Sequence, residues 1–261
     1  MKKYIVCLCS LIVFLNVKLG YGGGSILFNE VDEYFTIADS ADLSFQDGDW
    51  SLGMFLKIDD NSGNFFQYFF SNGPIGTANS INCFTREVGA ATNPGEICCQ
   101  VNDSDTTQIS NADFRSKNRF AGDGLWRLFI IQRETGSSQF AMYTVHTSSS
   151  VELEDTELDG GFDDIDSDIW YMGRKDDGNA DRYYGGNMAY VFRAQKSFST
   201  DEIKEIWKNP TSHIDDMDLF IPLLKGGIND IDLGVNKHTI TQNNSPGNSM
   251  EAPDVFVLGG I

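Results

Sequence analysis

The chain has 261 residues, of which 41% are hydrophobic and 12% are aromatic, and its formal net charge is −19. A chain of this size can bury a sizeable core as one large β domain, and aromatic side chains suit pleated, half-buried sheets. With 38 acidic and 19 basic residues, the composition argues against nucleic acid as a partner, because phosphate groups are bound by Lys and Arg.

The first 22 residues have the features of a secretory signal peptide. Two lysines precede an apolar run over 4–17, and a Gly-Tyr-Gly stretch ends at residue 22. The run is too short for a membrane span, so we predict cleavage and secretion, with no membrane insertion of the mature chain. Removing three lysines and no acid would change the net charge from −19 to −22. The alternative is an apolar strand or anchor that stays attached.

Short apolar stretches separated by turn residues recur from residue 25 to residue 194, which is typical of a sandwich or barrel. The clearest is 50–58, in which every second residue from Leu52 to Ile58 is apolar and shares one face. We predict strands at 25–28, 34–37, 50–58, 64–73, 81–87, 96–103, 125–134, 138–146, 168–174 and 187–194.

One short helix is predicted between Phe198 and Pro210. Hydroxyl and acidic residues stand at its start, and Ile203, Ile206 and Trp207 form one apolar stripe that must pack against the sheets. The remainder, 211–261, is predicted to supply closing strands within the same domain, 23–261, at 219–223, 237–242 and 254–260. A closing strand that pairs with the first strand would cover a sheet edge.

Three cysteines follow the predicted signal peptide. Cys83 and the neighbours Cys98 and Cys99 lie in two predicted strands joined by a turn-rich loop. We therefore expect a cross-strand disulfide between Cys83 and either Cys98 or Cys99, as suits an oxidising compartment. The alternative is three reduced cysteines in a cytoplasmic or virion protein.

These elements in this order resemble the laminin-G-like, concanavalin A-like jelly-roll superfamily. The blocks that carry the resemblance are 28–58, 124–133, 169–192 and 198–207, within a matched region of about 25–210. One departure is Tyr143–Thr147, where that family usually has a Tyr-x-Asp-Gly turn. The resemblance implies an all-β sandwich of two antiparallel sheets, and binding of carbohydrate or protein, often with calcium.

The resemblance also implies a position for calcium, where the first strand meets a late acidic loop. Calcium takes about six to eight oxygen ligands, largely from carboxylates and carbonyls. Glu30 and Asp32 follow the first strand, and Asp230 and Asp232 lie in the closing tail, so pairing of the two ends would bring them together. In a chain with 38 acidic residues, such groups also arise by chance.

The segment between the predicted strands at 168–174 and 187–194 contains Asp-Asp-Gly-Asn-Ala-Asp. It resembles half of an EF-hand loop but lacks the bidentate Glu and the flanking helices, so we interpret it as a connection between strands. Tyr183 and Tyr184 are predicted to be exposed there and to stack on a sugar. Arg174, Asp181 and Arg182 are predicted to supply hydrogen bonds, although Arg182 could instead pair with an acid.

Catalytic motifs are weak. Glu152, Glu154 and Glu157 resemble the Glu-x-Asp-x-x-Glu motif of family 16 glycoside hydrolases, with Glu154 replacing its Asp, but an acidic loop also explains them. The histidines, His146, His213 and His238, are scattered and form no recognisable motif. The tryptophans, Trp50, Trp126, Trp170 and Trp207, are predicted to lie in the core.

The sequence therefore predicts a secreted, non-catalytic binding or adhesion module for a glycan or a partner protein, with calcium as a structural cofactor. The main alternative is a structural, decoration or receptor-binding protein of a virus particle with the same fold. A glycoside hydrolase is the third reading.

Overall fold

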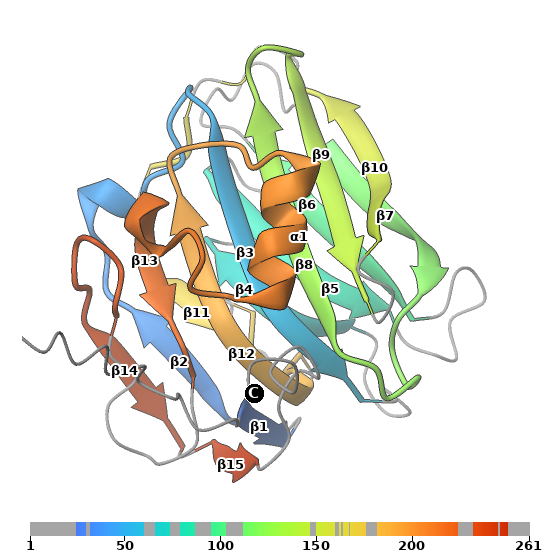
Figure 1. Ribbon diagram of the computed structural model, residues 1–261. Helices are drawn as coiled ribbons and strands as arrows, with labels where there is room; N and C mark the ends of the chain where they lie inside the picture. Colours follow the sequence, from blue (N-terminus) through green and yellow to red (C-terminus); the bar gives the residue numbers. More distant parts are fainter. Residues whose placement is uncertain are drawn as a thin grey trace, which may run out of the picture.

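The structure is a sandwich of two antiparallel sheets, as predicted (Figure 1). This computed structural model describes residues 25–29, 32–59, 66–73, 79–86, 95–102, 112–146, 150–159, 162, 164–166, 168–175, 182–223, 232–244 and 246–249. None of the helices in these ranges is long and apolar enough to cross a membrane. The predicted signal peptide and the closing segment at 254–260 lie outside the described residues.

Sheet A has eight strands, in the order β10-β9-β8-β3-β12-β1-β15, with β13 also paired to β12. The bounds are β1 (Ser25–Asn29), β3 (Trp50–Ile58), β8 (Arg127–Glu134), β9 (Gln139–Val145), β10 (Val151–Leu158), β12 (Gly185–Ala194), β13 (Met217–Ile221) and β15 (Gly247–Ser249). The long strand β12 pairs with β3 along one edge and with β1 and then β13 along the other.

Sheet B has seven strands, in the order β14-β2-β11-β4-β5-β6-β7. The bounds are β2 (Tyr34–Ile37), β4 (Phe66–Asn72), β5 (Ser80–Arg86), β6 (Glu96–Asn102), β7 (Ala112–Arg119), β11 (Trp170–Met172) and β14 (Ile240–Asn243). Because β14 pairs with β2 and β15 pairs with β1, the tail covers an edge strand of each sheet. The tail thus pairs with the first strand, through a segment that was not predicted to form a strand.

The core between the sheets is largely aliphatic and aromatic. The predicted inward face of β3, from Leu52 to Ile58, is buried there. Phe45 stacks on Trp170 at 5.3 Å between ring centroids and meets Trp50 edge-on at 4.8 Å. All four tryptophans are buried, as predicted.

The helix α1 (Thr200–Lys208) packs on the outer face of sheet A (Figure 1). The Ser199 side chain accepts a bond from the Glu202 backbone nitrogen, and the Glu202 carboxylate accepts one from the Ser199 backbone nitrogen, which completes a capping box. The predicted stripe is buried, with Trp207 stacked on Phe55 at 5.6 Å. Burial of each large apolar side chain contributes roughly 1.5–3 kcal/mol, which fixes this helix on the sheet.

Three strands were not predicted, β7, β10 and β15. The interpretation of 152–157 as an acidic loop was wrong, because this segment is strand β10 at the edge of sheet A. Its one buried side chain is the charged Glu154, and Leu153 and Leu158 are exposed, so the sequence does not show the expected apolar alternation there. The strand is bulged between Leu153 and Asp155.

The disulfide joins Cys83 to Cys99, which are register partners on β5 and β6. Both side chains face the core between the sheets. Cys98 is the next residue of β6, so it points to the other face, where its buried thiol lies beside Tyr68 and Phe84. The predicted cross-strand disulfide is confirmed, and strand alternation selects its partner.

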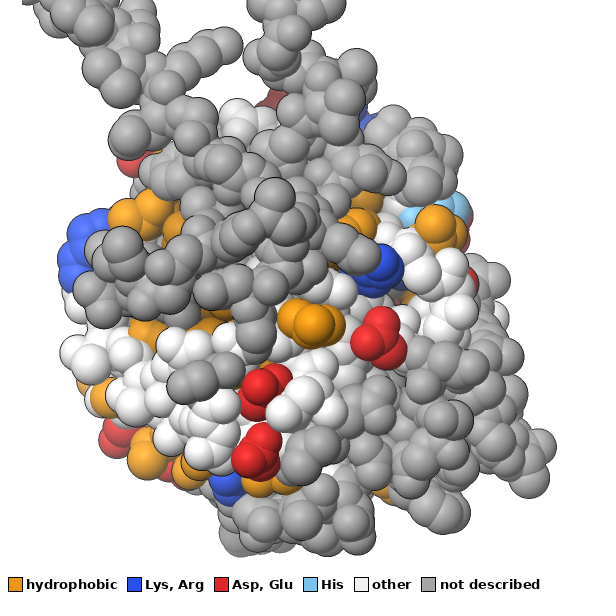
Figure 2. Space-filling model, turned by 90° about the horizontal axis from the view of Figure 1, so that it is seen from below, with side chains coloured by type: hydrophobic (Ala, Val, Ile, Leu, Met, Phe, Trp, Pro, Cys, Tyr) orange, Lys and Arg blue, Asp and Glu red, His pale blue; other side chains and the backbone are white. Residues whose placement is uncertain are grey.

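On the face that Figure 2 shows, acidic, basic and hydrophobic side chains of the described residues are interspersed. No large patch of one kind gathers there among the coloured side chains. The distinctive grouping of aromatic and basic side chains lies instead on the outer face of sheet B.

Candidate functional site

Arg174 and Tyr183 lie opposite each other where the chain leaves β11 and returns to β12, and they form an isolated antiparallel bridge. The guanidinium carbon of Arg174 lies 4.4 Å from the ring centroid of Tyr34 and 4.9 Å from that of Tyr171. Its Nε donates to the carbonyl oxygen of Lys175 at 2.9 Å. The ring centroids of Tyr183 and Tyr34 are 6.3 Å apart. We call Tyr34, Tyr171, Arg174 and Tyr183 the arginine–tyrosine cluster.

Strand alternation places this cluster on the outer face of sheet B. In β11, Trp170 and Met172 are buried in the core, so Tyr171 between them points outward. The same alternation in β2 puts Tyr34 beside it, with ring centroids 6.2 Å apart. Tyr34, Tyr171 and Arg174 are half-buried, so their outer edges reach solvent.

Arg182 extends the same face towards β4. Its guanidinium carbon lies 5.8 Å from the ring centroid of Phe66 and 5.9 Å from that of Tyr68. Tyr68 packs in turn on Phe84 of β5, with ring centroids 4.9 Å apart. The alternative prediction, a salt bridge from Arg182 to an acid, is not found within the part of the chain that the structure describes.

A row of polar side chains crosses sheet B beside the cluster. Tyr171, Ser71, Asn82 and Gln100 are register partners on four adjacent strands. The Ser71 hydroxyl donates to the Asn82 amide oxygen at 2.7 Å, and the buried amide nitrogen of Asn82 has no hydrogen-bond partner among the described residues. Such amide and hydroxyl groups next to aromatic rings are the elements from which ligand sites are built.

The remaining residues that were predicted to bind a ligand in this loop are Tyr183, Tyr184 and Asp181. The predicted exposure of Tyr184 was wrong: its ring is fully buried, and its hydroxyl lies 3.1 Å from the carbonyl oxygens of Lys57 and Asn187. Burial raises the pKa of Tyr184 well above its ordinary value. The predicted exposure of Tyr183 was wrong as well, because its side chain is only 8% exposed, although it belongs to the cluster. Asp181 lies outside the described residues.

Of the predicted calcium ligands, Glu30 and Asp230 lie outside the described residues. Asp32 is half-buried, and one of its carboxylate oxygens accepts a bond from the Asn29 amide at 3.3 Å. Calcium binding near Asp32 therefore stays a prediction.

Asp232 has a structural role that the sequence did not predict. Its buried carboxylate accepts bonds from the backbone nitrogens of Phe220 at 2.9 Å, Gly234 at 2.7 Å and His238 at 2.8 Å, and lies 2.6 Å from His238 Nδ1. Burial raises its pKa, but the bonds from His238 and these backbone groups outweigh burial and lower it. Four partners fill the carboxylate's lone-pair positions, which argues against Asp232 as a calcium ligand.

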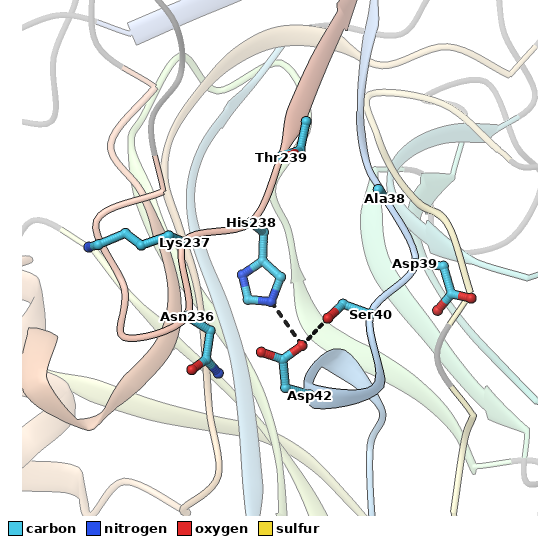
Figure 3. A pocket seen from close by; sticks show the side chains of 8 residues that line it. All are labelled: Ala38, Asp39, Ser40, Asp42, Asn236, Lys237, His238 and Thr239. Carbon is cyan, nitrogen blue, oxygen red and sulfur yellow. Dashed lines mark hydrogen bonds and ion pairs between the residues drawn. The ribbon is translucent and has the colours of Figure 1, made fainter.

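The other ring nitrogen of His238, Nε2, lies 3.1 Å from a carboxylate oxygen of Asp42, beside an open pocket of about 220 Å³ (Figure 3). The pocket is lined by residues of 38–42 and 236–239. The Ser40 hydroxyl donates to Asp42 and not to the imidazole. A nucleophile must contact its base directly, so these side chains are not arranged as a nucleophilic triad.

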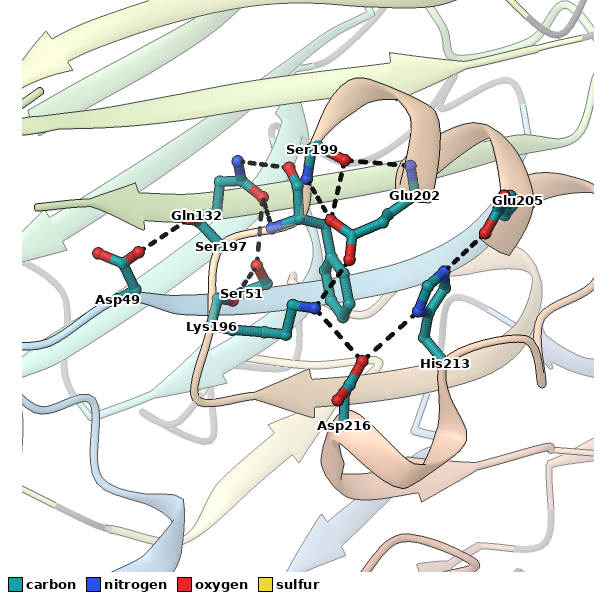
Figure 4. Close-up of polar contacts among 11 residues, drawn as sticks. Asp49, Ser51, Gln132, Lys196, Ser197, Ser199, Glu202, Glu205, His213 and Asp216 are labelled. Carbon is teal, nitrogen blue, oxygen red and sulfur yellow. Dashed lines mark hydrogen bonds and ion pairs between the residues drawn. The ribbon is translucent and has the colours of Figure 1, made fainter. Parts of the chain in front are cut away.

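A second polar network ties α1 to the segment that follows it (Figure 4). Oxygen and nitrogen atoms of Glu202, His213 and Asp216 lie within 4.8 Å of one another, a spacing that could hold a metal. However, Lys196 Nζ lies 2.8 Å from Glu202 and 3.3 Å from Asp216. The lysine ammonium therefore already supplies the positive charge between these carboxylates.

The acidic residues of β10 also have structural partners. Glu154, at the bulge, accepts bonds from the Thr144 hydroxyl at 2.5 Å and from the Lys117 backbone nitrogen at 2.8 Å. It thus joins the edge of sheet A to β7 at the edge of sheet B. Glu152 lies 3.2 Å from His146 Nε2. These contacts account for the middle residue of the hydrolase-like motif without catalysis.

No protein-family model matches the chain, and no curated protein matches it significantly. Solved structures do share its fold. A candidate carbohydrate-binding protein from Bacteroides ovatus superposes with a TM-score of 0.60 at 13% identity, covering 90% of this chain. This chain spans only 60% of the length of that protein.

A heptameric SAP-like pentraxin from Limulus polyphemus superposes with a TM-score of 0.56 at 12% identity, covering 91% of this chain and 99% of the pentraxin. The sialidase NanB of Streptococcus pneumoniae gives a TM-score of 0.50 at 18% identity, covering 70% of this chain and 27% of the sialidase. At these identities the likeness shows a shared fold, a jelly-roll sandwich.

Proposed function

We propose that this chain is a secreted, non-catalytic glycan-binding module whose ligand lies on the outer face of sheet B. The observation that carries the proposal is the arginine–tyrosine cluster. It presents half-exposed rings of Tyr34 and Tyr171 around a guanidinium group that they hold in place. Sugars combine apolar ring faces with hydroxyl groups, so aromatic rings beside polar donors suit them.

The shared fold supports this class of function without fixing it. The Bacteroides ovatus protein that superposes on this chain is a candidate carbohydrate-binding protein. The disulfide between Cys83 and Cys99 is consistent with an oxidising compartment, which supports secretion. We retain calcium as a proposed structural cofactor near Asp32.

The test is a glycan array with the full chain and with Tyr34→Ala and Tyr171→Ala. We expect each substitution to weaken binding roughly tenfold or more, as truncation of a central aromatic contact does. Tyr143→Ala is the matched control, because Tyr143 is a half-buried tyrosine on the outer face of sheet A. Equal losses in all three variants, or no binding by the native chain, would contradict the proposal.

Secretion and calcium have separate tests. A mass spectrum of the native protein should show an N-terminus near Gly23 and one disulfide, whereas an intact Met1 on protein that co-purifies with particles would favour the virion alternative. Calcium should raise the melting temperature of the native chain, and Asp32→Asn should remove that rise. No change with calcium would count against the cation site.

A further inference from the structure

We infer that the ligand of this face is an acidic glycan, whose carboxylate binds the guanidinium group of Arg174. The inference rests on the proposed glycan-binding function and specifies the chemical class of the ligand. Arg174 and Arg182 both lie over aromatic rings, and neither has a carboxylate partner in the described part of the chain.

Other arginines of the molecule form ion pairs with acidic side chains, which are twice as numerous in this chain as basic ones. The ion pairs are Arg86 with Glu96, Arg127 with Asp123, Arg133 with Asp159 and Arg193 with Asp218. Arg174 and Arg182, by contrast, lie over tyrosine and phenylalanine rings and form a local positive group that could bind an anion.

The geometry at Arg174 suits a carboxylate. Its Nε is bonded to the Lys175 carbonyl, and Tyr34 and Tyr171 contact its guanidinium group. The two terminal nitrogens are left without an acceptor among the described residues. A planar guanidinium binds a carboxylate through two parallel N–H bonds, and a group that is already fixed loses little entropy on binding.

The remaining contacts would come from the sugar ring and its hydroxyl groups. The half-exposed ring of Tyr34 offers an apolar face, and the polar row through Ser71 and Asn82 lies beside Tyr171. The chain's net charge of −19 does not prevent this. At physiological ionic strength, exposed charges more than about 8 Å away are largely screened. The charges nearest to Arg174 therefore determine whether an anion binds there.

The experiment compares sugars that carry a carboxylate with counterparts that lack it. Calorimetry would compare the binding of polygalacturonate with that of its methyl ester, and the binding of a sialylated oligosaccharide with that of its desialylated form. A third probe is a polysaccharide that carries sulfate groups and no carboxylates. We expect the native chain to bind a carboxylate form at least tenfold more tightly than its neutral counterpart. Arg174→Ala and Arg174→Gln should remove that preference, because a charge-assisted bond contributes roughly tenfold or more.

Lys208→Ala is the matched control. It removes the same unit of positive charge from an exposed position on α1, against the other sheet. It should leave the preference unchanged. Arg174→Lys should restore only part of it, since lysine keeps the charge without the planar fork. Melting temperatures of all variants would show whether each is folded.

Two results would overturn the inference and remain distinguishable. If the chain binds neutral sugars equally well, and Tyr34→Ala weakens binding while Arg174→Ala does not, glycan binding stands and the acidic ligand is wrong. If the chain prefers the sulfated polymer, the carboxylate assignment is also wrong. If it binds no glycan of either kind, the proposed function fails with it.

Discussion

Glu202 connects the start of α1 to the rest of the sandwich, and its loss should destabilise the fold by a predictable amount. Its carboxylate accepts bonds from the Ser199 backbone nitrogen at 2.8 Å, from the Ser199 hydroxyl at 2.9 Å and from Lys196 Nζ at 2.8 Å (Figure 4). Burial raises the pKa of Glu202, but the bonds from Lys196 and Ser199 outweigh burial and lower it from 4.5 to about 2.

That difference corresponds to at most about 3 kcal/mol of folding free energy. The side chain is 29% exposed, so solvent screening reduces the effect. We expect Glu202→Gln to lower the free energy of unfolding by about 1–2 kcal/mol at pH 7. Gln keeps the shape of the capping residue and removes only the charge.

The sign of the pH dependence follows from the lowered pKa. Because the folded pKa lies below the unfolded one, the contribution is fully present above about pH 4.5 and is lost as the pH falls towards about 2. Urea denaturation of both proteins between pH 7 and pH 2.5 measures it. The difference in the free energy of unfolding between the native chain and the Glu202→Gln variant should decrease steadily below pH 4.5.

Asp201→Asn is the control, because its carboxylate is 87% exposed and pairs only with Lys204 among the described residues. It should change stability by less than about 0.5 kcal/mol. Two results would refute this account of the network. The loss in the free energy of unfolding for Glu202→Gln could be as large at pH 2.5 as at pH 7, or it could be no larger at pH 7 than the loss for Asp201→Asn.

Three further measurements probe the sandwich itself. Gly53→Ala would place a Cβ 2.1 Å from the Phe192 ring, so we expect a loss of roughly 1–3 kcal/mol by urea denaturation, and an unchanged midpoint would show that the ring moves freely. Cys83→Ala removes a disulfide that spans 16 residues, which should cost about 3 kcal/mol under non-reducing conditions and make the melting temperature insensitive to reductant. Burial lowers the pKa of His238, but its bonds to two carboxylates outweigh burial and raise it, so its stabilisation is complete below about pH 6.5 and lost as the pH rises through the raised value. His238→Gln should therefore reduce the difference in stability between pH 6 and pH 9, and an unchanged difference would contradict this assignment.

Much of the fold could be predicted because its signals are local. The alternation in β3 and the apolar stripe of α1 each occur within a few residues, and both proved to be buried as predicted. The strand β10 was missed because it lies at a sheet edge, where charged side chains replace the apolar alternation. There the sequence resembles a loop, and only pairing with β9 shows a strand.

The candidate site was predicted in part. The sequence singled out Arg174, Arg182 and Tyr183 in one loop, but it did not indicate Tyr34 or Tyr171. Tyr34 is 140 positions from Arg174 along the chain and joins it only because β2 pairs with β11. No periodicity within one segment could have predicted that contact.

Adjacent residues show most clearly the difference between what the sequence predicts and what only the tertiary structure shows. Composition and spacing by themselves indicated an all-β chain, a capped helix and two strands whose cysteines could form a disulfide. Only the tertiary structure decided that Cys99 forms the disulfide while Cys98 does not, and that Tyr171 lines the surface while its neighbours Trp170 and Met172 are buried. The physical reason is that neighbouring side chains in extended chain point to opposite faces, and register against a distant strand decides which face is the core.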